Sequence, residues 1–530
     1  MRSLFYVLLI FLVFGCETQT KQSDNPFLTS LNEPIDYANV SADDIKEYAE
    51  IMLAGSSEAI VKLKTTEPSF NSVFAAIDEI ISDLNIASNR CFMLYWVSPD
   101  SLSRVNGLAG FQLLDSLSTT IYSDKVIFDK MLSVSQSEGY NNLEDHQKLL
   151  VDQQILRFKQ SGVNLDDEKR AKFILLTKEI SKLSSDYSNN MNSASEVIIL
   201  DENGVKGLTE NFKNTYKVSD NRYEIPVMNA TRSPVMNNAI KEDTRKAFYL
   251  KYNNIGSEQN LDILDKMVQK RYELAQLLGY ESYAAYNLYP KMAKNPETVW
   301  NFINDLVNRS KTKAKKDLEI LQKLKEKDSE NTLNSKLMAW DISYYNNKIL
   351  KTQYNVDHEK IREYLPMEQC LSGILDIYET LFGLDFRKVE NPSVWHQEVD
   401  MYEVFDGENL LGRFYLDLFP RPNKESWFYG VELKSGRATL DGYEVPTSML
   451  LGNFTRPTET IPSLISFREL NTLFHEFGHI IDGLSYQGEF ALQADSKIDF
   501  TESMSQIFEN WTWYYEMLSS FAKHYETGEI

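Results

Sequence analysis

The feature that most constrains this sequence is a helical pattern near its C-terminal end that carries two histidines. Apolar residues recur through it at helical spacing, which predicts a packed helix. They are Leu470, Leu473, Phe474, Phe477, Ile480, Ile481 and Leu484. Ser466 and Glu469 have the S-x-x-E form of a capping box, which predicts where this helix begins. His475 and His479 stand four residues apart, so they share one face of the helix, one turn from each other.

An H-E-x-x-H sequence on a helix can present two imidazole nitrogens to a single metal ion. Glu476, beside the first histidine, is placed to act as a general base on a water molecule. A bare motif of this kind also occurs by chance in long chains. This chain has only six histidines, and two of them fall in this one apolar helix, which favours a zinc site.

A catalytic zinc ion has three protein ligands and one open position, so a third ligand is expected from a nearby element. A second helical pattern covers residues 499–511. We expect Asp499 to be its N-cap and Glu502, on its first turn, to be the third ligand. The alternative is that Glu502 completes a capping box with Asp499.

Glu509 lies seven residues after Glu502, so the two carboxylates share a helical face. We expect Glu509 to form a hydrogen bond with a ligand histidine and thereby to orient it. The alternative is an exposed carboxylate on a solvated helix.

These residues resemble the thimet oligopeptidase family of zinc metallopeptidases, which includes bacterial oligopeptidases and peptidyl-dipeptidases. The resemblance rests on residues 475–479, 499–502 and 505–506, and it extends over nearly all of the chain after its leader. Further similar stretches are residues 277–280, 292–294, 340–341, 344–345, 365–366, 412–418 and 453–454.

The resemblance implies a mainly α-helical, two-lobed, deep-cleft fold of the zincin type, with a small β-sheet beside the zinc helix. It implies one Zn²⁺ bound by His475, His479 and Glu502, with Glu476 as the general base in the hydrolysis of short peptides. It leaves endopeptidase and peptidyl-dipeptidase activity as alternatives.

In the family, a strand pairs with the extended backbone of the substrate. The matching residues here are 447–453, with Leu451, Gly452 and Asn453 as candidate substrate contacts. The alternative is an ordinary strand inside the sheet.

The family also carries a later, glycine- and tyrosine-rich segment whose histidine and tyrosines stabilise the transition state, and residues matching it are not found before Ile530. We therefore expect the catalytic domain to be incomplete at its C-terminus, and the 530 residues alone to have little activity. A fragment of a longer product and a natural short form are both consistent with this. A non-catalytic, lipid-anchored peptide-binding relative is the alternative function, although such a protein has no need of Glu476.

Residues 1–15 combine one arginine with a short apolar run and end before Cys16, which is typical of a bacterial lipoprotein signal. We expect Cys16 to carry the lipid and residues 16–25 to form a polar tether, which places the protein in the bacterial cell envelope, on the periplasmic or surface side. An uncleaved anchor and an ordinary signal peptide are the alternatives.

The composition of the chain limits the classes of molecule that it is expected to bind. The net charge of −22 argues against nucleic acid, because phosphate binding needs concentrated lysine and arginine. Cys91 and Cys370, the two other cysteines, make no disulfide framework. We expect a monomer, although the sequence does not determine the oligomeric state.

Two regions follow the tether. Residues 26–240 form an N-terminal helical region, and residues 241–530 form the catalytic domain. Helices are expected at residues 42–64, 70–88, 166–192, 251–278, 296–327, 340–350 and 366–382. Strands are expected at 197–200 and 223–227, in a hairpin of 399–405 and 410–419, and at 445–454.

Overall fold

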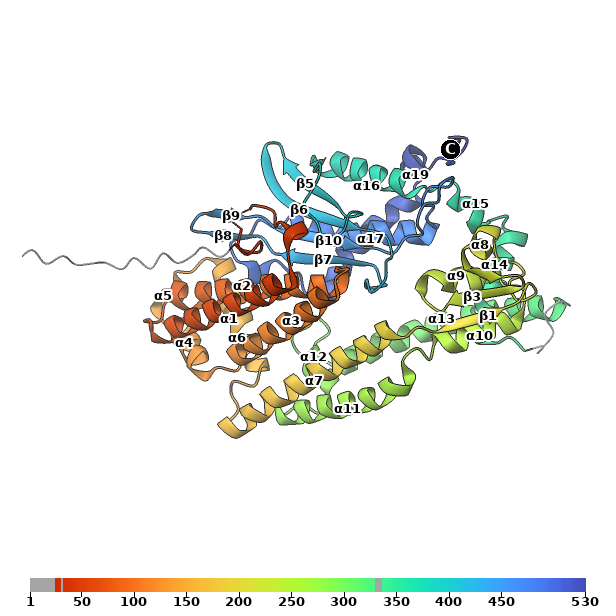
Figure 1. Cartoon of the computed structure of the whole chain (residues 1–530). Helices are drawn as coiled ribbons and strands as arrows, with labels where there is room; N and C mark the ends of the chain where they lie inside the picture. The colour runs from red at the N-terminus through yellow and green to blue at the C-terminus, as the bar shows by residue number, and fades with distance from the viewer. Residues whose placement is uncertain (1–23, 30–31, 329–335) are drawn as a thin grey trace, which may run out of the picture.

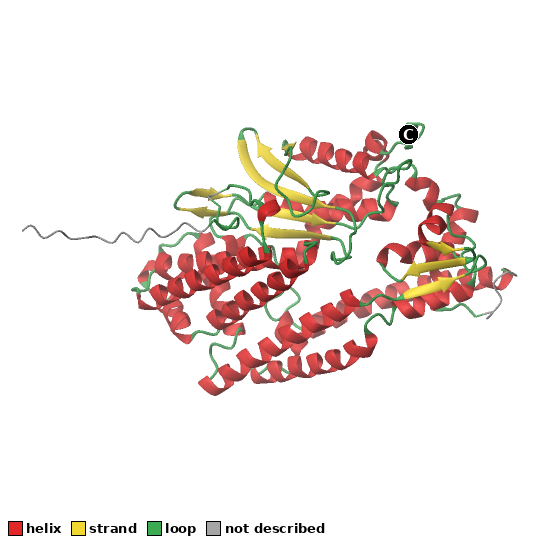
Figure 2. Cartoon of the chain, in the orientation of Figure 1, coloured by secondary structure: helices red, strands yellow, loops and turns green. Residues whose placement is uncertain are grey.

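Helices make up most of the chain, and a five-stranded sheet lies in its C-terminal third (Figures 1 and 2). This confirms the expectation of a mainly α-helical fold with a small sheet. The structure is a computed structural model that describes residues 24–29, 32–328 and 336–530. The expected signal sequence, Cys16 and most of the expected tether lie outside the described residues.

The N-terminal helices are α1 (Ala42–Thr65), α2 (Ala76–Val97), α3 (Ser101–Tyr122), α4 (Lys125–Ser135), α5 (Glu138–Asn141), α6 (Asp145–Gln160) and α7 (Asp167–Ser193). Helices α1 to α6 pack together against the five-stranded sheet, whereas α7 lies along the later helix α11 (Ser257–Leu277) (Figure 1). A 3₁₀ turn, η1 (Tyr37–Asn39), and a π-helical turn, η2 (Phe70–Ala75), precede α1 and α2.

The middle of the chain adds a small three-stranded sheet and a second set of helices. The strands are β1 (Val197–Leu200), β2 (Lys217–Ser219) and β3 (Arg222–Pro226), in the order β1-β3-β2. The helices are α8 (Glu210–Tyr216), α9 (Asn229–Asn238), α10 (Glu242–Tyr252), α11 (Ser257–Leu277), α12 (Tyr283–Leu288), α13 (Pro296–Lys327), η3 (Ala339–Asp341), α14 (Ile342–Gln353), α15 (His358–Arg362) and α16 (Met367–Phe382).

The last part of the chain holds the larger sheet and the helix with both histidines. Its strands are β4 (Asp385–Lys388), β5 (Asp400–Asp406), β6 (Asn409–Asp417), β7 (Tyr429–Lys434), β8 (Arg437–Thr439), β9 (Gly442–Glu444) and β10 (Thr447–Leu451). Its helices are α17 (Phe467–Leu484), η4 (Ala491–Gln493), α18 (Ile498–Glu509), η5 (Asn510–Trp513) and α19 (Tyr515–Phe521).

Two expectations about local structure are wrong. The helix expected over 251–278 is interrupted, because α10 ends at Tyr252 and α11 begins only after Gly256, whose φ of 66° is left-handed. The expected tether stops short of Asn25, which is buried and donates its side-chain amide to the Asp44 carbonyl at 2.8 Å. The two helices on either side of the interruption, α10 and α11, form as their patterns indicate.

The larger sheet has the strand order β4-β5-β6-β10-β7. The expected hairpin is confirmed as β5 and β6, which pair antiparallel around a two-residue turn at Gly407 and Glu408. Gly407 has a φ of 59°, which suits the tight turn. β10 pairs parallel with β6 and antiparallel with β7, so β10 is an interior strand and β7 is an edge strand.

Both faces of this sheet are buried, each in a different core. On one face Tyr415 and Met449 join a core with apolar residues of α1 to α6. On the other face Phe414 and Leu450 join a core with α16, α17 and α18. The alternation of side chains along a strand produces this arrangement. The sheet therefore connects the N-terminal helices to the helix that carries the histidines.

The boundary expected between residues 240 and 241 does not coincide with a break in packing. Ala239 and Phe248, one on each side of it, belong to the same buried cluster. In the described part of the chain, no helix combines the length and apolar character needed to cross a bilayer.

Asp78, on α2, anchors the connection between α17 and α18. Its buried carboxylate accepts the backbone N–H groups of Ala491 at 3.2 Å and Leu492 at 2.8 Å. Burial raises the pKa of Asp78 to about 6, although these two amides and Arg437 act in the opposite direction.

This raised pKa predicts a pH-dependent stability. The folded chain holds the Asp78 proton more tightly than the unfolded chain, so the contribution is present below about pH 4 and is lost as pH rises through about 6. Relative to Asp78→Asn, which stays neutral, the wild type should lose on the order of 2 kcal/mol between about pH 4.5 and 7.5. Melting temperatures measured across this range test it. A difference that does not change with pH contradicts the prediction.

Candidate metal centre

The helix α17 begins at the expected capping box and buries the expected face. The Glu469 amide donates to the Ser466 hydroxyl at 3.2 Å, and the Ser466 amide donates to the Glu469 carboxylate at 2.7 Å. The apolar residues of the pattern are buried against the sheet and α16. His475, Glu476 and His479 lie on the other side, which is only partly buried.

Gly478 allows α18 to approach α17 closely. A Cβ atom at this position would lie 2.9 Å from the Ser505 Cα and 2.9 Å from the Phe508 ring. Ser505 and Phe508 are themselves buried. The two helices touch at this point. Along α18, Glu502 precedes the contact and Glu509 follows it, and both lie opposite the histidines.

Asp499 is not the N-cap of α18, contrary to expectation. Lys497 occupies that position, and the Asp499 carboxylate accepts the backbone N–H of Ala293 at 3.1 Å. This contact joins α18 to a segment far away in the sequence. Glu502 does not complete a capping box with Asp499, and its side chain is directed to the histidines instead.

Three potential ligand atoms converge between the two helices. Glu502 Oε2 lies 3.1 Å from His475 Nε2 and 3.5 Å from His479 Nε2. The three ligand atoms all lie within 4.8 Å of one another, and no other cluster of this kind occurs among the described residues. All three residues of this cluster are the ones that the sequence analysis led us to expect.

The cluster fits a zinc ion by donor type and by spacing. Two imidazole nitrogens and one carboxylate oxygen form a donor set that catalytic zinc sites use. Tetrahedral ligands about 2.1 Å from zinc stand roughly 3.4 Å from each other, close to the separations of Glu502 from the two histidines. Burial lowers the pKa of His479, which favours the neutral imidazole that a metal requires.

Neighbouring side chains orient two of these candidate ligands. The hydroxyl of Ser505, which is fully buried, donates to Glu502 Oε2 at 2.8 Å. Glu509 Oε1 lies 2.7 Å from His475 Nδ1, the contact that the sequence led us to expect for this residue. A carboxylate only accepts, so in the neutral ring Nδ1 carries the hydrogen and Nε2 presents its lone pair to the cluster.

Glu476 is held by the edge strand. Its Oε2 atom accepts the backbone N–H of Gly430, on β7, at 2.7 Å. Burial raises the pKa of Glu476 above its ordinary value, and the Gly430 amide opposes this shift. A Cβ atom at Gly430 would lie 2.8 Å from the Glu476 carbonyl oxygen, so only glycine permits this approach. Sequence reasoning missed Gly430, because no local pattern indicates contact between β7 and α17.

The strand expected to pair with substrate lies in the interior of the sheet. Leu451 belongs to β10, which has a partner strand on each side and offers no free edge. The Gly452 amide donates to the Asp417 carbonyl at 2.8 Å, and the Asn453 side chain donates to the Glu425 and Trp427 carbonyls. The sheet edge beside α17 is that of β7.

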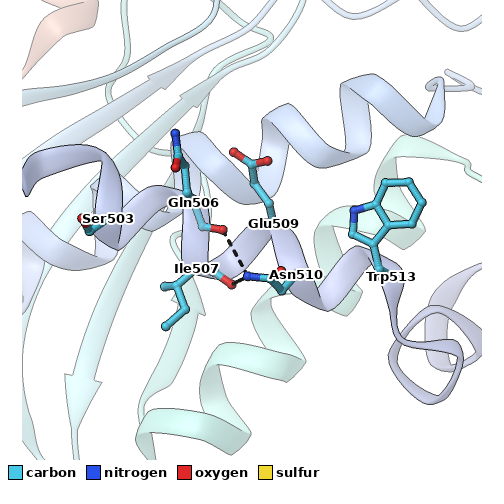
Figure 3. A pocket seen from close by; sticks show the side chains of 6 residues that line it. All are labelled: Ser503, Gln506, Ile507, Glu509, Asn510 and Trp513. Carbon is cyan, nitrogen blue, oxygen red and sulfur yellow. Dashed lines mark hydrogen bonds between the residues drawn. The ribbon is translucent and has the colours of Figure 1, made fainter. Parts of the chain in front are cut away.

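An open depression borders the cluster on α18 and η5 (Figure 3). It is lined by Ser503, Gln506, Ile507, Glu509, Asn510 and Trp513. The Asn510 side-chain amide turns back to the carbonyl oxygen of Ile507, at 3.0 Å, and is thereby satisfied. Glu509 is both part of this depression and in contact with His475, so the depression adjoins the outer side of the His475 ring.

Replacing Gly478 tests the helix contact. Gly478→Ala places a methyl group 2.9 Å from the backbone of α18, and such overpacking costs about 1–3 kcal/mol. We expect a lower melting temperature and weaker zinc binding, measured by calorimetry and by competition with a chelator.

The matched control is Gly55→Ala on α1, where an added methyl group meets nothing within 4 Å. It should stabilise the chain by up to about 1 kcal/mol, because alanine favours helix more than glycine does. Unchanged zinc affinity in Gly478→Ala would contradict the role of this contact.

Comparisons with known proteins agree with this arrangement. The family described as Peptidase family M3 matches residues 235–530. Saccharolysin of Saccharomyces cerevisiae is 32% identical over 490 residues, which cover 88% of this chain and 69% of that protein. Oligopeptidase A of Escherichia coli is 31% identical over 438 residues, which cover 79% of this chain and 64% of that protein. The aligned part thus spans about two thirds of the length of these relatives.

Proposed function

This chain belongs to peptidase family M3, and from that membership we propose that it is a zinc-dependent metallopeptidase that hydrolyses short oligopeptides. The observation that carries the proposal is the convergence of His475, His479 and Glu502, with Glu476 beside them. The names of the similar proteins, saccharolysin and oligopeptidase A, support the substrate class.

In this proposal His475, His479 and Glu502 hold one zinc ion. When bound, zinc polarises the peptide carbonyl and lowers the pKa of water to about 7. Glu476 removes a proton from the attacking water and transfers it to the nitrogen of the leaving amine. The raised pKa of Glu476, caused by burial, brings the carboxyl nearer to the range in which it can both accept and return a proton.

We propose that an extended substrate backbone pairs with the edge of β7 that has no partner strand, where it would replace side-chain contacts that Gly430 and Glu432 now make. This strand ends the sheet and lies beside α17, and its Gly430 amide already faces the Glu476 carboxylate. The Glu432 carbonyl is on the same edge and accepts the side-chain amide of Asn89 at 3.1 Å. Main-chain pairing of this kind binds peptides with little dependence on their sequence.

The alternative of a non-catalytic, metal-holding peptide-binding protein has no observation in its favour. A binding protein needs no carboxylate placed next to the metal ligands by a dedicated backbone contact, as Glu476 is by Gly430.

Two variants separate metal binding from catalysis. His479→Ala removes a ligand and should lower the zinc content of the purified chain. In a chain extended by the C-terminal segment that the family resemblance leads us to expect, Glu476→Gln should retain zinc but reduce hydrolysis of a quenched fluorescent peptide by about 10²–10⁴-fold, the usual contribution of a general base. Full zinc content in His479→Ala would refute the ligand assignment. Undiminished hydrolysis in Glu476→Gln would refute the role of the base.

We also propose that Cys16 is lipid-modified and holds the protein in the bacterial cell envelope. The proposal rests on the arginine, the short apolar run and the small residue that precede Cys16. In a bacterium grown with labelled fatty acid, the wild type should carry the label and Cys16→Ser should not. The variant keeps Cys91 and Cys370, both buried, as an internal control. Equal labelling of both chains would contradict the proposal.

A further inference from the structure

A line of three side chains extends from the His475 ring into the buried contact between α17 and η5. Glu509 uses one carboxylate oxygen for His475 Nδ1 and the other for the side-chain amide of Asn471, each at 2.7 Å. The carbonyl oxygen of the Asn471 side chain is 2.8 Å from the hydroxyl of Thr512. Thr512 is fully buried, whereas the Glu509 side chain is 31% exposed.

The chemistry of the groups fixes the direction of every hydrogen bond in this line. A carboxylate only accepts, so Asn471 must turn its NH₂ group to Glu509. The Asn471 oxygen then faces Thr512, whose hydroxyl must donate to it. That hydroxyl also lies 2.8 Å from the Glu509 backbone carbonyl, so its one hydrogen is shared between this carbonyl and the Asn471 oxygen.

We infer that Asn471 and Thr512 are positioning residues that act through Glu509 to set the orientation and tautomer of His475. The inference rests on the zinc site in the proposed function. The Glu509 side chain is partly exposed and has several rotatable bonds. Contact with water alone would not hold it in one conformation. Asn471, one helical turn before His475, holds the second carboxylate oxygen by a hydrogen bond. The buried Thr512 holds the Asn471 side chain in the same way. Partners of this kind alter metal affinity by about 10–100-fold in other sites.

This arrangement also assigns a role to the contact between α17 and η5. Asn471 and His475 both project from α17, whereas Glu509 ends α18 and Thr512 belongs to η5. Any displacement of η5 along α17 therefore breaks the line at Asn471 or at Glu509. The Nε2 atom of His475 then loses its fixed direction toward Glu502, from which it is 3.1 Å away.

The test compares zinc affinity, measured by competition with a chelator, among full-length variants. Thr512→Val keeps the shape but removes the hydroxyl, and Asn471→Leu removes both polar groups. Each should weaken zinc binding about tenfold. Thr512→Ser, which restores the hydroxyl, should bind zinc as the wild type does. With Co²⁺ in place of zinc, the visible spectrum of the two weakened variants should differ from that of the wild type.

Matched controls separate positioning from general destabilisation. Thr244 and Asn347 are also buried, and they donate to the carbonyls of Gly204 and Asn237, each at 2.9 Å. Thr244→Val and Asn347→Leu should lower the melting temperature of the metal-free chain but leave zinc affinity and the Co²⁺ spectrum unchanged. In a Glu509→Gln background, Asn471→Leu should weaken binding less than about twofold, because its effect passes through Glu509.

Two outcomes would overturn the inference, and a third would overturn the proposed function on which it rests. Wild-type zinc affinity in both Thr512→Val and Asn471→Leu would show that these residues only contribute to packing. A full tenfold effect of Asn471→Leu in the Glu509→Gln background would show that it does not act through Glu509. Failure of the wild-type chain to bind zinc at all would refute the proposed function, which is a separate result from failure of the variants to differ.

Discussion

The close approach of two backbone segments to α17 is the constraint on which the rest of the site depends. Gly478 allows α18 to contact the helix, and Gly430 allows the edge strand β7 to do so, each where a Cβ atom would lie under 3.0 Å from a neighbour. The first contact brings Glu502 and Glu509 to the histidines, and the second places a backbone amide on Glu476. The geometry of the site is therefore set by packed backbone, whose positions vary far less than those of long side chains.

Charge explains why such a rigid arrangement suits a cation. Glu476, Glu502 and Glu509 gather around two imidazoles, and their hydrogen-bond donors in the described structure are neutral. Those donors are a backbone amide, the Ser505 hydroxyl, the Asn471 side-chain amide and the Nδ1–H of the neutral His475 ring. Neutral donors hold carboxylates in place without cancelling their charge, which suits the divalent cation of the proposed function.

The parts of the site that follow from helical periodicity could be predicted from the sequence. The capping box at Ser466 and the shared face of His475 and His479 depend only on residues within one helix. Helical periodicity also places Asn471 on the face of the histidines, since it lies one turn before His475. Glu502 needed more than periodicity, namely the rule of three zinc ligands and the resemblance to a family.

Features that depend on tertiary contacts could not be predicted in this way. Asp499 has the residue type of an N-cap, but its carboxylate is used by Ala293, which lies 206 residues away. The pattern at residues 447–451 predicts a strand, but it does not reveal that β10 is interior and β7 is the edge. Gly430 and Thr512 act across separate elements, and nothing local marks either residue.

The burial of the larger sheet on both faces has a consequence for the synthesis of the chain. One of its two cores combines residues 27–163 with residues 395–490, so the first group emerges from the ribosome long before its partners exist. At about 5–20 residues per second, the N-terminal helices wait on the order of tens of seconds with their sheet-facing apolar surface uncovered. During this interval the uncovered apolar surface is available for aggregation.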